Sequence, residues 1–78
     1  MYTVTLNNLK EGDRAVILNI GGQGEFRRRL LEMGFMPGSE ILVERYAPLR
    51  DPIELLVKGS HLSLRREEAK LVNVDIIL

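Results

Sequence analysis

The side chains that most often carry out chemistry are few and scattered in this sequence. His61 is the only histidine, and the chain contains no cysteine. A metal site would need carboxylates around His61, and the sequence gathers none there, so a turn-flanking histidine half in solvent is the simpler interpretation. Ser39, Ser60 and Ser63 all fall in or beside predicted turns, where small polar side chains are expected on structural grounds. We therefore predict no catalytic residues and no metal ligands.

A glycine-rich segment, Gly21 to Gly24, comes directly before a predicted helix. Backbone amides at the start of a helix can bind phosphate, so the segment suggests a nucleotide-binding loop. Such a loop of the Walker type needs a lysine followed by serine or threonine at the helix start, and this chain has Glu25 and Phe26 there. The sequence therefore favours a flexible connection.

Three arginines follow one another at the start of the same helix, Arg27, Arg28 and Arg29. At about 100 degrees per residue they fan around the helix and do not form one stripe. We expect one of them to pack its aliphatic stem against the rest of the fold. The other two could face an acidic partner or nucleic acid, and ordinary solvated surface charge is the alternative.

Exposed apolar residues are expected at two further places. Met36 opens a predicted turn after the helix, and Leu49 lies with Arg50 in a loop bounded by Pro48 and Pro52. Turns and proline-bounded loops lie at the surface, so Met36 and Leu49 are candidates for an adhesive patch. Arg27, Arg28, Met36, Leu49 and Arg50 are the predicted partner-binding residues.

The elements that position these residues are one helix and several short strands. Helical spacing of apolar residues predicts a helix over about residues 25–33, with Gly24 as N-cap and Gly34 as the left-handed residue that ends it. Phe35 is expected to contact Leu30 at that helix end. The aromatic and methionine side chains expected to serve in the core or at the helix end are Phe26, Met33 and Phe35.

Two-residue alternation and β-branched content predict the strands. A type II turn is expected at Met36 to Ser39, a type II′ turn at Gly59-Ser60 and one helical turn over about residues 65–70. The expected strands cover residues 1–9, 15–20, 40–46, 53–58, 61–64 and 71–78. The last strand should place Val72, Val74, Ile76 and Leu78 on one face. So small a sheet must close or leave open edges, which predicts a mostly β fold, an SH3-like barrel of five or six strands with one inserted α-helix.

Composition limits the classes of function. A chain of 78 residues has room for one domain, residues 1–78, and its 45% hydrophobic and 28% charged content is that of a packed domain. The formal net charge of +0 gives no general attraction to phosphate. The first residues lack the pattern of a signal peptide, and no apolar run approaches the about 20 residues of a membrane span. The cytoplasm is the expected location.

Three blocks of sequence resemble the FeoA family in order and spacing. They are Arg28 to Gly38, Ala47 to Ile53 and Leu62 to Ala69, and the resemblance runs from about Leu6 to Ile76. The resemblance implies an SH3-like barrel, no enzymatic activity, and association with the FeoB ferrous iron transporter on its cytosolic side. We therefore expect a cytoplasmic accessory protein of ferrous iron uptake that acts by protein–protein interaction, without a cofactor and without binding nucleic acid.

Other functions stay open at the level of sequence. The same barrel occurs as the carboxy-terminal domain of iron-dependent repressors, so a detached regulatory module is one alternative. A small nucleic-acid-binding barrel is a second alternative, because barrels of this size often bind single strands. A metal-sensing or metal-carrying protein is a third, although one histidine and scattered carboxylates give it little support. The oligomeric state is not predicted.

Overall fold

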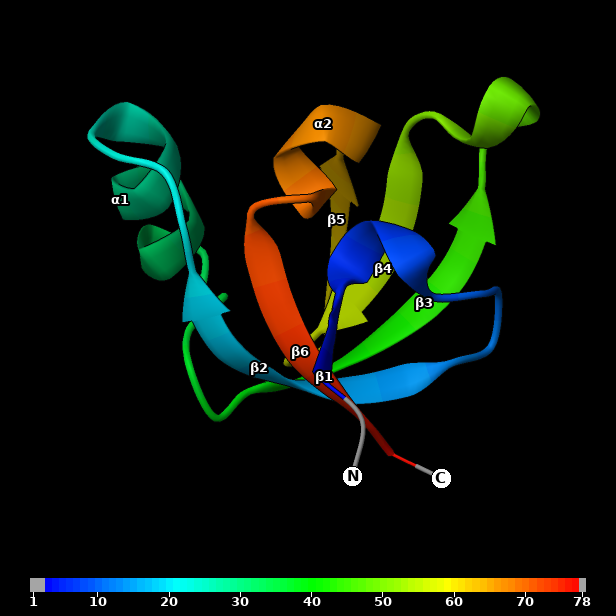
Figure 1. The fold of residues 1–78 in the computed structure, drawn as a ribbon, viewed down its shortest axis with the longest axis horizontal. Coiled ribbons are helices and arrows are strands. Elements are labelled where there is room, and N and C mark those ends of the chain that lie inside the picture. The colour runs from blue at the N-terminus through cyan, green and yellow to red at the C-terminus, as the bar shows by residue number, and fades with distance from the viewer. Residues whose placement is uncertain (1–2, 78) are drawn as a thin grey trace.

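A computed structural model describes residues 3–77, which form one antiparallel sheet of six strands in the order β1-β6-β2-β3-β4-β5. Figure 1 shows the strands bending around a common centre, with both ends of the described chain on the same side. The strands are β1 Thr3–Thr5, β2 Arg14–Ile20, β3 Glu40–Tyr46, β4 Ile53–Val57, β5 Ser60–Leu64 and β6 Val72–Ile77. The mostly β barrel with six strands and one inserted helix is confirmed.

Helical segments occupy four of the connections. The main helix, α1 Glu25–Glu32, stands to one side of the sheet between β2 and β3, and α2 Arg66–Ala69 lies between β5 and β6 (Figure 1). Two 3-10 helices, η1 Leu6–Asn8 and η2 Pro48–Arg50, follow β1 and β3. In Figure 1 the η2 coil lies on the opposite side of the molecule from α1. The two places that were predicted to bind a partner are therefore on different sides.

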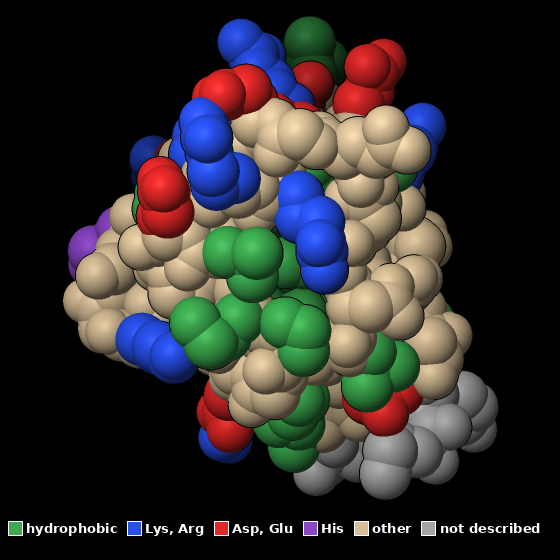
Figure 2. All heavy atoms as spheres, turned by 90° about the vertical axis from the view of Figure 1, so that its left-hand side faces the viewer, with side chains coloured by type: hydrophobic (Ala, Val, Ile, Leu, Met, Phe, Trp, Pro, Cys, Tyr) green, Lys and Arg blue, Asp and Glu red, His purple; other side chains and the backbone are tan. Residues whose placement is uncertain are grey.

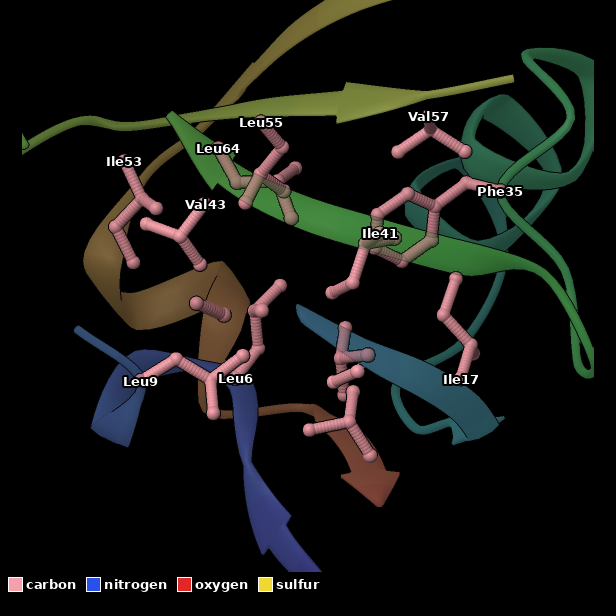
Figure 3. Packing of buried hydrophobic residues seen from close by; sticks show 14 of the residues in the cluster. Leu6, Leu9, Ile17, Phe35, Ile41, Val43, Ile53, Leu55, Val57 and Leu64 are labelled. Carbon is pink, nitrogen blue, oxygen red and sulfur yellow. The ribbon is translucent and has the colours of Figure 1, made fainter. Parts of the chain in front are cut away.

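The core lies inside the bent sheet and takes side chains from almost every element (Figure 3). Phe35, Ile41, Val43 and Leu55 are among its fully buried members. Leu6 and Leu9 reach the same core from η1 and the residue that follows it. The predicted strand over residues 1–9 is thus wrong after Thr5, because Leu6 and Leu9 are three residues apart and a 3-10 turn places such residues on one face. Its first two residues lie outside the described residues.

The end of α1 follows the predicted geometry. Gly34 has a φ of 85°, in the left-handed region, and its N–H donates to the Leu31 carbonyl at 3.0 Å. The Phe35 N–H donates to the Leu30 carbonyl at 2.9 Å. This pair of bonds is the Schellman arrangement, and its usual apolar contact is available because Leu30 and Phe35 are both fully buried. The helix end therefore fixes where the next turn begins.

One turn prediction is confirmed and one is wrong. Met36 to Ser39 forms a turn in which the Ser39 N–H donates to the Met36 carbonyl at 3.0 Å and Gly38 has a φ of 91°, as the type II prediction requires. The turn between β4 and β5 is centred on Lys58 and Gly59, with φ of 50° and 78°, and not on Gly59-Ser60. Two positive φ values are typical of a type I′ turn, whose twist suits a two-residue hairpin.

The last strand agrees with its predicted alternation. Val72 and Val74 are fully buried, and Ile76 is partly buried against the same core. Leu78, the fourth residue expected on this face, lies outside the described residues. β6 pairs with both β1 and β2, so it joins the first strand to the rest of the sheet.

Candidate partner-binding site

Two of the three exposed arginines of α1 form ion pairs with carboxylates of the same chain. Arg28 Nη2 lies 2.5 Å from Glu25 Oε1 one turn earlier, and Arg29 Nη2 lies 3.1 Å from Glu68 Oε2 of α2. Arg29 also lies over the Phe26 ring, 6.0 Å from its centroid. Arg29 thus contacts the rest of the chain through its guanidinium, although its side chain is exposed like those of Arg27 and Arg28. Arg27 and Arg28 are exposed, as predicted, and Arg27 has no ion-pair partner within residues 3–77.

Apolar side chains gather on the same side of the molecule. Figure 2 looks at the side that carries α1 and shows a group of hydrophobic side chains with basic side chains beside it. The Met36 side chain is 37% exposed. Its turn is bonded to β2, because Ile17 donates to the Ser39 carbonyl at 2.9 Å and accepts from the Gly38 N–H at 2.8 Å. The neighbouring Leu18, which the sequence did not single out, is also 37% exposed.

Met33 takes the second of the two roles predicted for it, at the helix end and not in the core. It is the C-cap of α1, with φ and ψ of −85° and 5°, and its side chain is 42% exposed. Its helical spacing from Leu30 predicted a shared buried face, but the chain leaves helical geometry at the C-cap and the side chain turns outward. Leu30 is fully buried and Phe26 is partly buried, so only part of the predicted apolar face enters the core.

The loop between β3 and β4 has a different construction. Leu49 is 94% exposed, and both Leu49 and Arg50 have left-handed backbone, with φ of 64° and 62°. The loop is closed by two backbone bonds, from the Ala47 N–H to the Pro52 carbonyl at 3.0 Å and from the Arg50 N–H to the Ala47 carbonyl at 2.9 Å. We call residues Ala47 to Pro52 the Leu49 loop. Its tip is a leucine that touches almost none of the chain.

Tyr46 contacts the Leu49 loop through Arg50 and is itself anchored by hydrogen bonds to Leu9 and Glu11. The Arg50 guanidinium lies 4.2 Å from the centroid of the Tyr46 ring. The Tyr46 N–H donates to Glu11 Oε2 at 3.0 Å, and its hydroxyl donates to the Leu9 carbonyl. Burial raises the pKa of the Tyr46 hydroxyl above its ordinary value. On the other side of the loop, Asp51 Oδ1 accepts from the Arg66 N–H of α2 at 3.1 Å.

The predicted residues therefore form two separate surfaces. Arg27 and Arg28 lie on α1 and Met36 lies in the turn that follows it, whereas Leu49 and Arg50 belong to the Leu49 loop, which follows β3. Met36 precedes β3 and Leu49 follows it, and the 7 residues of that strand separate them by about 20 Å. The single patch expected from Met36 and Leu49 does not exist. The sequence missed the separation because the distance depends on an uninterrupted strand between them.

His61 has a carboxylate partner that the sequence did not predict. Its Nδ1 lies 2.8 Å from Glu44 Oε1, which links β5 to β3 across the intervening β4. The His61 side chain is 75% exposed, in agreement with the turn-flanking position. Within residues 3–77, no group of three histidine, aspartate or glutamate side chains could hold a metal ion. The geometry described here offers surfaces for binding a macromolecule.

None of the helices in residues 3–77 is both long enough and apolar enough to cross a membrane. The fold defines the class of the protein, which is a small SH3-like barrel with an inserted helix. Residues 4–76 match the FeoA domain family. The chain belongs to that family.

Known relatives agree in sequence and in structure. Over 72 residues the chain is 47% identical to the Fe(2+) transport protein A/Fe(2+) transporter FeoB fusion protein of Porphyromonas gingivalis, covering 92% of this chain and 8% of that protein. The solution structure of FeoA from Chlorobium tepidum matches with a TM-score of 0.92 and 40% identity, covering 96% of this chain and 71% of that one. The zinc-complexed FeoA of Stenotrophomonas maltophilia, described as a procaryotic SH3 domain protein, matches with a TM-score of 0.80 and 32% identity over 92% of this chain and 89% of that one.

Proposed function

We propose that this protein is a non-enzymatic, cytoplasmic accessory protein of ferrous iron uptake that binds the cytosolic part of a FeoB-like membrane transporter. The observation that carries the proposal is the relative from Porphyromonas gingivalis, in which a domain 47% identical to this chain is fused to FeoB. A covalent link gives two domains a high effective concentration for each other. Where the two proteins are separate chains, a docking surface must replace that link.

The exposed side chains are of the types that such a docking surface needs. Met36 and Leu49 are exposed apolar residues on the α1 side and in the Leu49 loop. Arg50 is exposed next to Leu49 in the sequence, and Arg28 is exposed on α1, the helix that precedes Met36. Met and Arg are enriched in protein interfaces relative to the rest of the surface, and Arg is enriched among the residues that carry most of the binding energy. No cofactor is required for this role.

A nucleic-acid-binding barrel is supported less well. The chain has a formal net charge of +0, so it offers no general attraction to a phosphate backbone. Arg28 and Arg29 of the arginine run are already paired with Glu25 and Glu68. Binding to single-stranded DNA or RNA that weakens steeply with added salt would favour this alternative over the proposal.

Calorimetry with the purified cytosolic domain of FeoB from the same genome tests the proposal. We expect saturable binding by the wild type, and weaker binding by Met36→Asp or Leu49→Asp if the corresponding surface is used. Leu71→Asp is the control for Leu49→Asp, because Leu71 is 40% exposed but lies beside Phe26 of α1 and not in the Leu49 loop. Absence of binding by the folded wild-type protein, in every nucleotide state of the transporter domain, would refute the proposal.

A further inference from the structure

The backbone of the Leu49 loop is in a conformation that its residues do not favour. Leu49 has φ and ψ of 64° and 18°, and Arg50 follows with a φ of 62°. For residues with a side chain, left-handed backbone brings the Cβ atom close to the carbonyl oxygen, and glycine or asparagine is the usual choice. Two successive residues of other types in this region are strained. Such strain persists only where the surrounding structure enforces it.

The surrounding structure does enforce it. Hydrogen bonds close the loop at Ala47, Arg50 and Pro52, and Asp51 is tied to the amide of Arg66. The Arg50 guanidinium rests on the Tyr46 ring at 4.2 Å. The Leu49 side chain gains no burial from this arrangement, because it is 94% exposed and lies outside the core. The loop thus presents one aliphatic side chain in a fixed position at no benefit to the folded chain.

We propose that Leu49 inserts into an apolar socket on the cytosolic part of the transporter, and that Arg50 pairs with a carboxylate at the rim of that socket. This inference rests on the proposed function and assigns the contact to the Leu49 loop. A loop backbone already held in its bound conformation loses little entropy on binding, which increases affinity. The free energy of binding then offsets the free energy that the strained backbone costs the unbound protein.

Charge gives the reason for an acidic rim. Within residues 3–77, Arg50 has no carboxylate at ion-pair distance, a property that it shares with Arg27, Arg65 and Arg66. Stacking on Tyr46 holds the planar guanidinium beside Leu49. A guanidinium fixed in this way is suited to a two-point hydrogen bond with a carboxylate.

Two other occupants fit the loop less well. A symmetric contact between two copies through this loop would bring Arg50 against Arg50 of the second copy, which is repulsive. A lipid surface would gain only one exposed leucine, far less apolar area than a membrane-bound amphipathic helix buries. A protein socket is the occupant that matches both the leucine and the arginine.

The decisive variant is Leu49→Asn, because asparagine tolerates the left-handed backbone and removes the apolar side chain. We expect it to raise the melting temperature by about 4 to 8 °C through relief of strain. We expect the same variant to weaken binding to the purified FeoB cytosolic domain by about thirtyfold, the loss typical of an interface hot spot. Leu71→Asn, at an exposed leucine outside the Leu49 loop, should leave the dissociation constant unchanged.

Arg50→Glu tests the rim of the socket. It should weaken binding at least tenfold, and more at low salt than at high salt, because it opposes a carboxylate. If Leu49→Asn binds like the wild type, the inference is wrong while the proposed function stands. If the folded wild type does not bind the transporter domain at all, both are wrong.

Further outcomes would overturn the choice of occupant. Sedimentation velocity of the wild type alone should show no association that Leu49→Asn abolishes, and such association would assign the loop to a second copy. Flotation with vesicles of anionic lipid should likewise show no Leu49-dependent binding. A lower melting temperature for Leu49→Asn would refute the strain on which the inference depends.

Discussion

The end of α1 and the Leu49 loop both require left-handed backbone, and they meet that requirement with opposite residue types. At the helix end the left-handed residue is Gly34, with a φ of 85°. In the Leu49 loop the left-handed residues are Leu49 and Arg50, with φ of 64° and 62°. Glycine adopts this conformation freely, whereas leucine and arginine do so against their preference.

The difference separates residues that serve the fold from residues that serve a partner. At the helix end, local preference, hydrogen bonds and burial of Leu30 and Phe35 all favour the same structure. Agreement between levels of this kind is typical of segments selected for folding. In the Leu49 loop, preference and burial both oppose the observed structure. Conflict of this kind concentrates at functional sites.

The largest effect should come from the core contact of α1. Leu30→Ala removes a fully buried side chain, so it should lower the free energy of unfolding by about 2 to 5 kcal/mol. That is a large share of the stability of so small a domain. Denaturant unfolding followed by circular dichroism measures it, with Leu31→Ala as the control at a partly buried position. Equal losses for the two variants would contradict the assignment of Leu30 to the core.

The helix-end glycine should show the next largest effect. Gly34→Val forces a side chain into left-handed backbone, so we expect a loss of about 1 to 2 kcal/mol in the free energy of unfolding. A Cβ atom there would lie 3.4 Å from Cδ of Lys58, a flexible side chain, so strain and not a clash should dominate. Lys58→Ala should therefore not rescue the variant. Rescue by Lys58→Ala would show that crowding, and not backbone strain, is the cause.

Sequence patterns predicted the segments in which local preference and fold agree. The bounds of β3 at Glu40 and Tyr46, the Gly34 helix end and the Met36 to Ser39 turn were all predicted correctly. Each has a residue whose conformational preference is strong, such as glycine or proline, or a clear alternation of apolar residues. The patterns also identified Leu49 and Arg50 as exposed, because prolines bound their loop.

The remaining features could not be predicted because they depend on distant contacts. The left-handed backbone of Leu49, Arg50 and Lys58 runs against residue preference, so no local pattern indicates it. The pairing of His61 with Glu44 depends on the register of three strands. The division of the predicted site into two surfaces is different, because it follows from the length of β3, whose bounds the sequence patterns predicted correctly.

Support of the Leu49 loop by Tyr46 should contribute less than the core contact of α1. Tyr46→Phe removes the hydroxyl that donates to the Leu9 carbonyl, so it should lower the free energy of unfolding by about 0.5 to 1.5 kcal/mol. Burial raises the pKa of Tyr46 in the folded protein above its ordinary value of 10.0, so the folded state holds this proton more tightly than the unfolded state. Its contribution is therefore fully present below about pH 10 and is lost as the pH rises through the folded pKa.

Unfolding measured from neutral to strongly alkaline pH tests this dependence. The wild type should lose stability in the alkaline range, and Tyr46→Phe should lose less over the same range because it has no hydroxyl to ionise. Identical slopes for the two proteins would show that Tyr46 titrates alike in the folded and unfolded states. Unfolding of Leu49→Asn is measured in parallel. This variant keeps Tyr46 and changes only the strained residue, so it separates the effect of the Tyr46 contacts from the effect of backbone strain.

The smallest effect should come from the exposed ion pair on α1. Glu25→Gln removes the partner of Arg28 and a negative charge at the helix start, and we expect a loss of at most about 0.5 kcal/mol that disappears in high salt. The Glu25→Gln variant is more informative in a measurement of binding to the transporter domain. If the α1 side contacts an acidic part of the transporter, freeing Arg28 should tighten the complex. If the Leu49 loop alone makes the contact, the dissociation constant should not change, and a loss of affinity would show that Glu25 itself touches the partner.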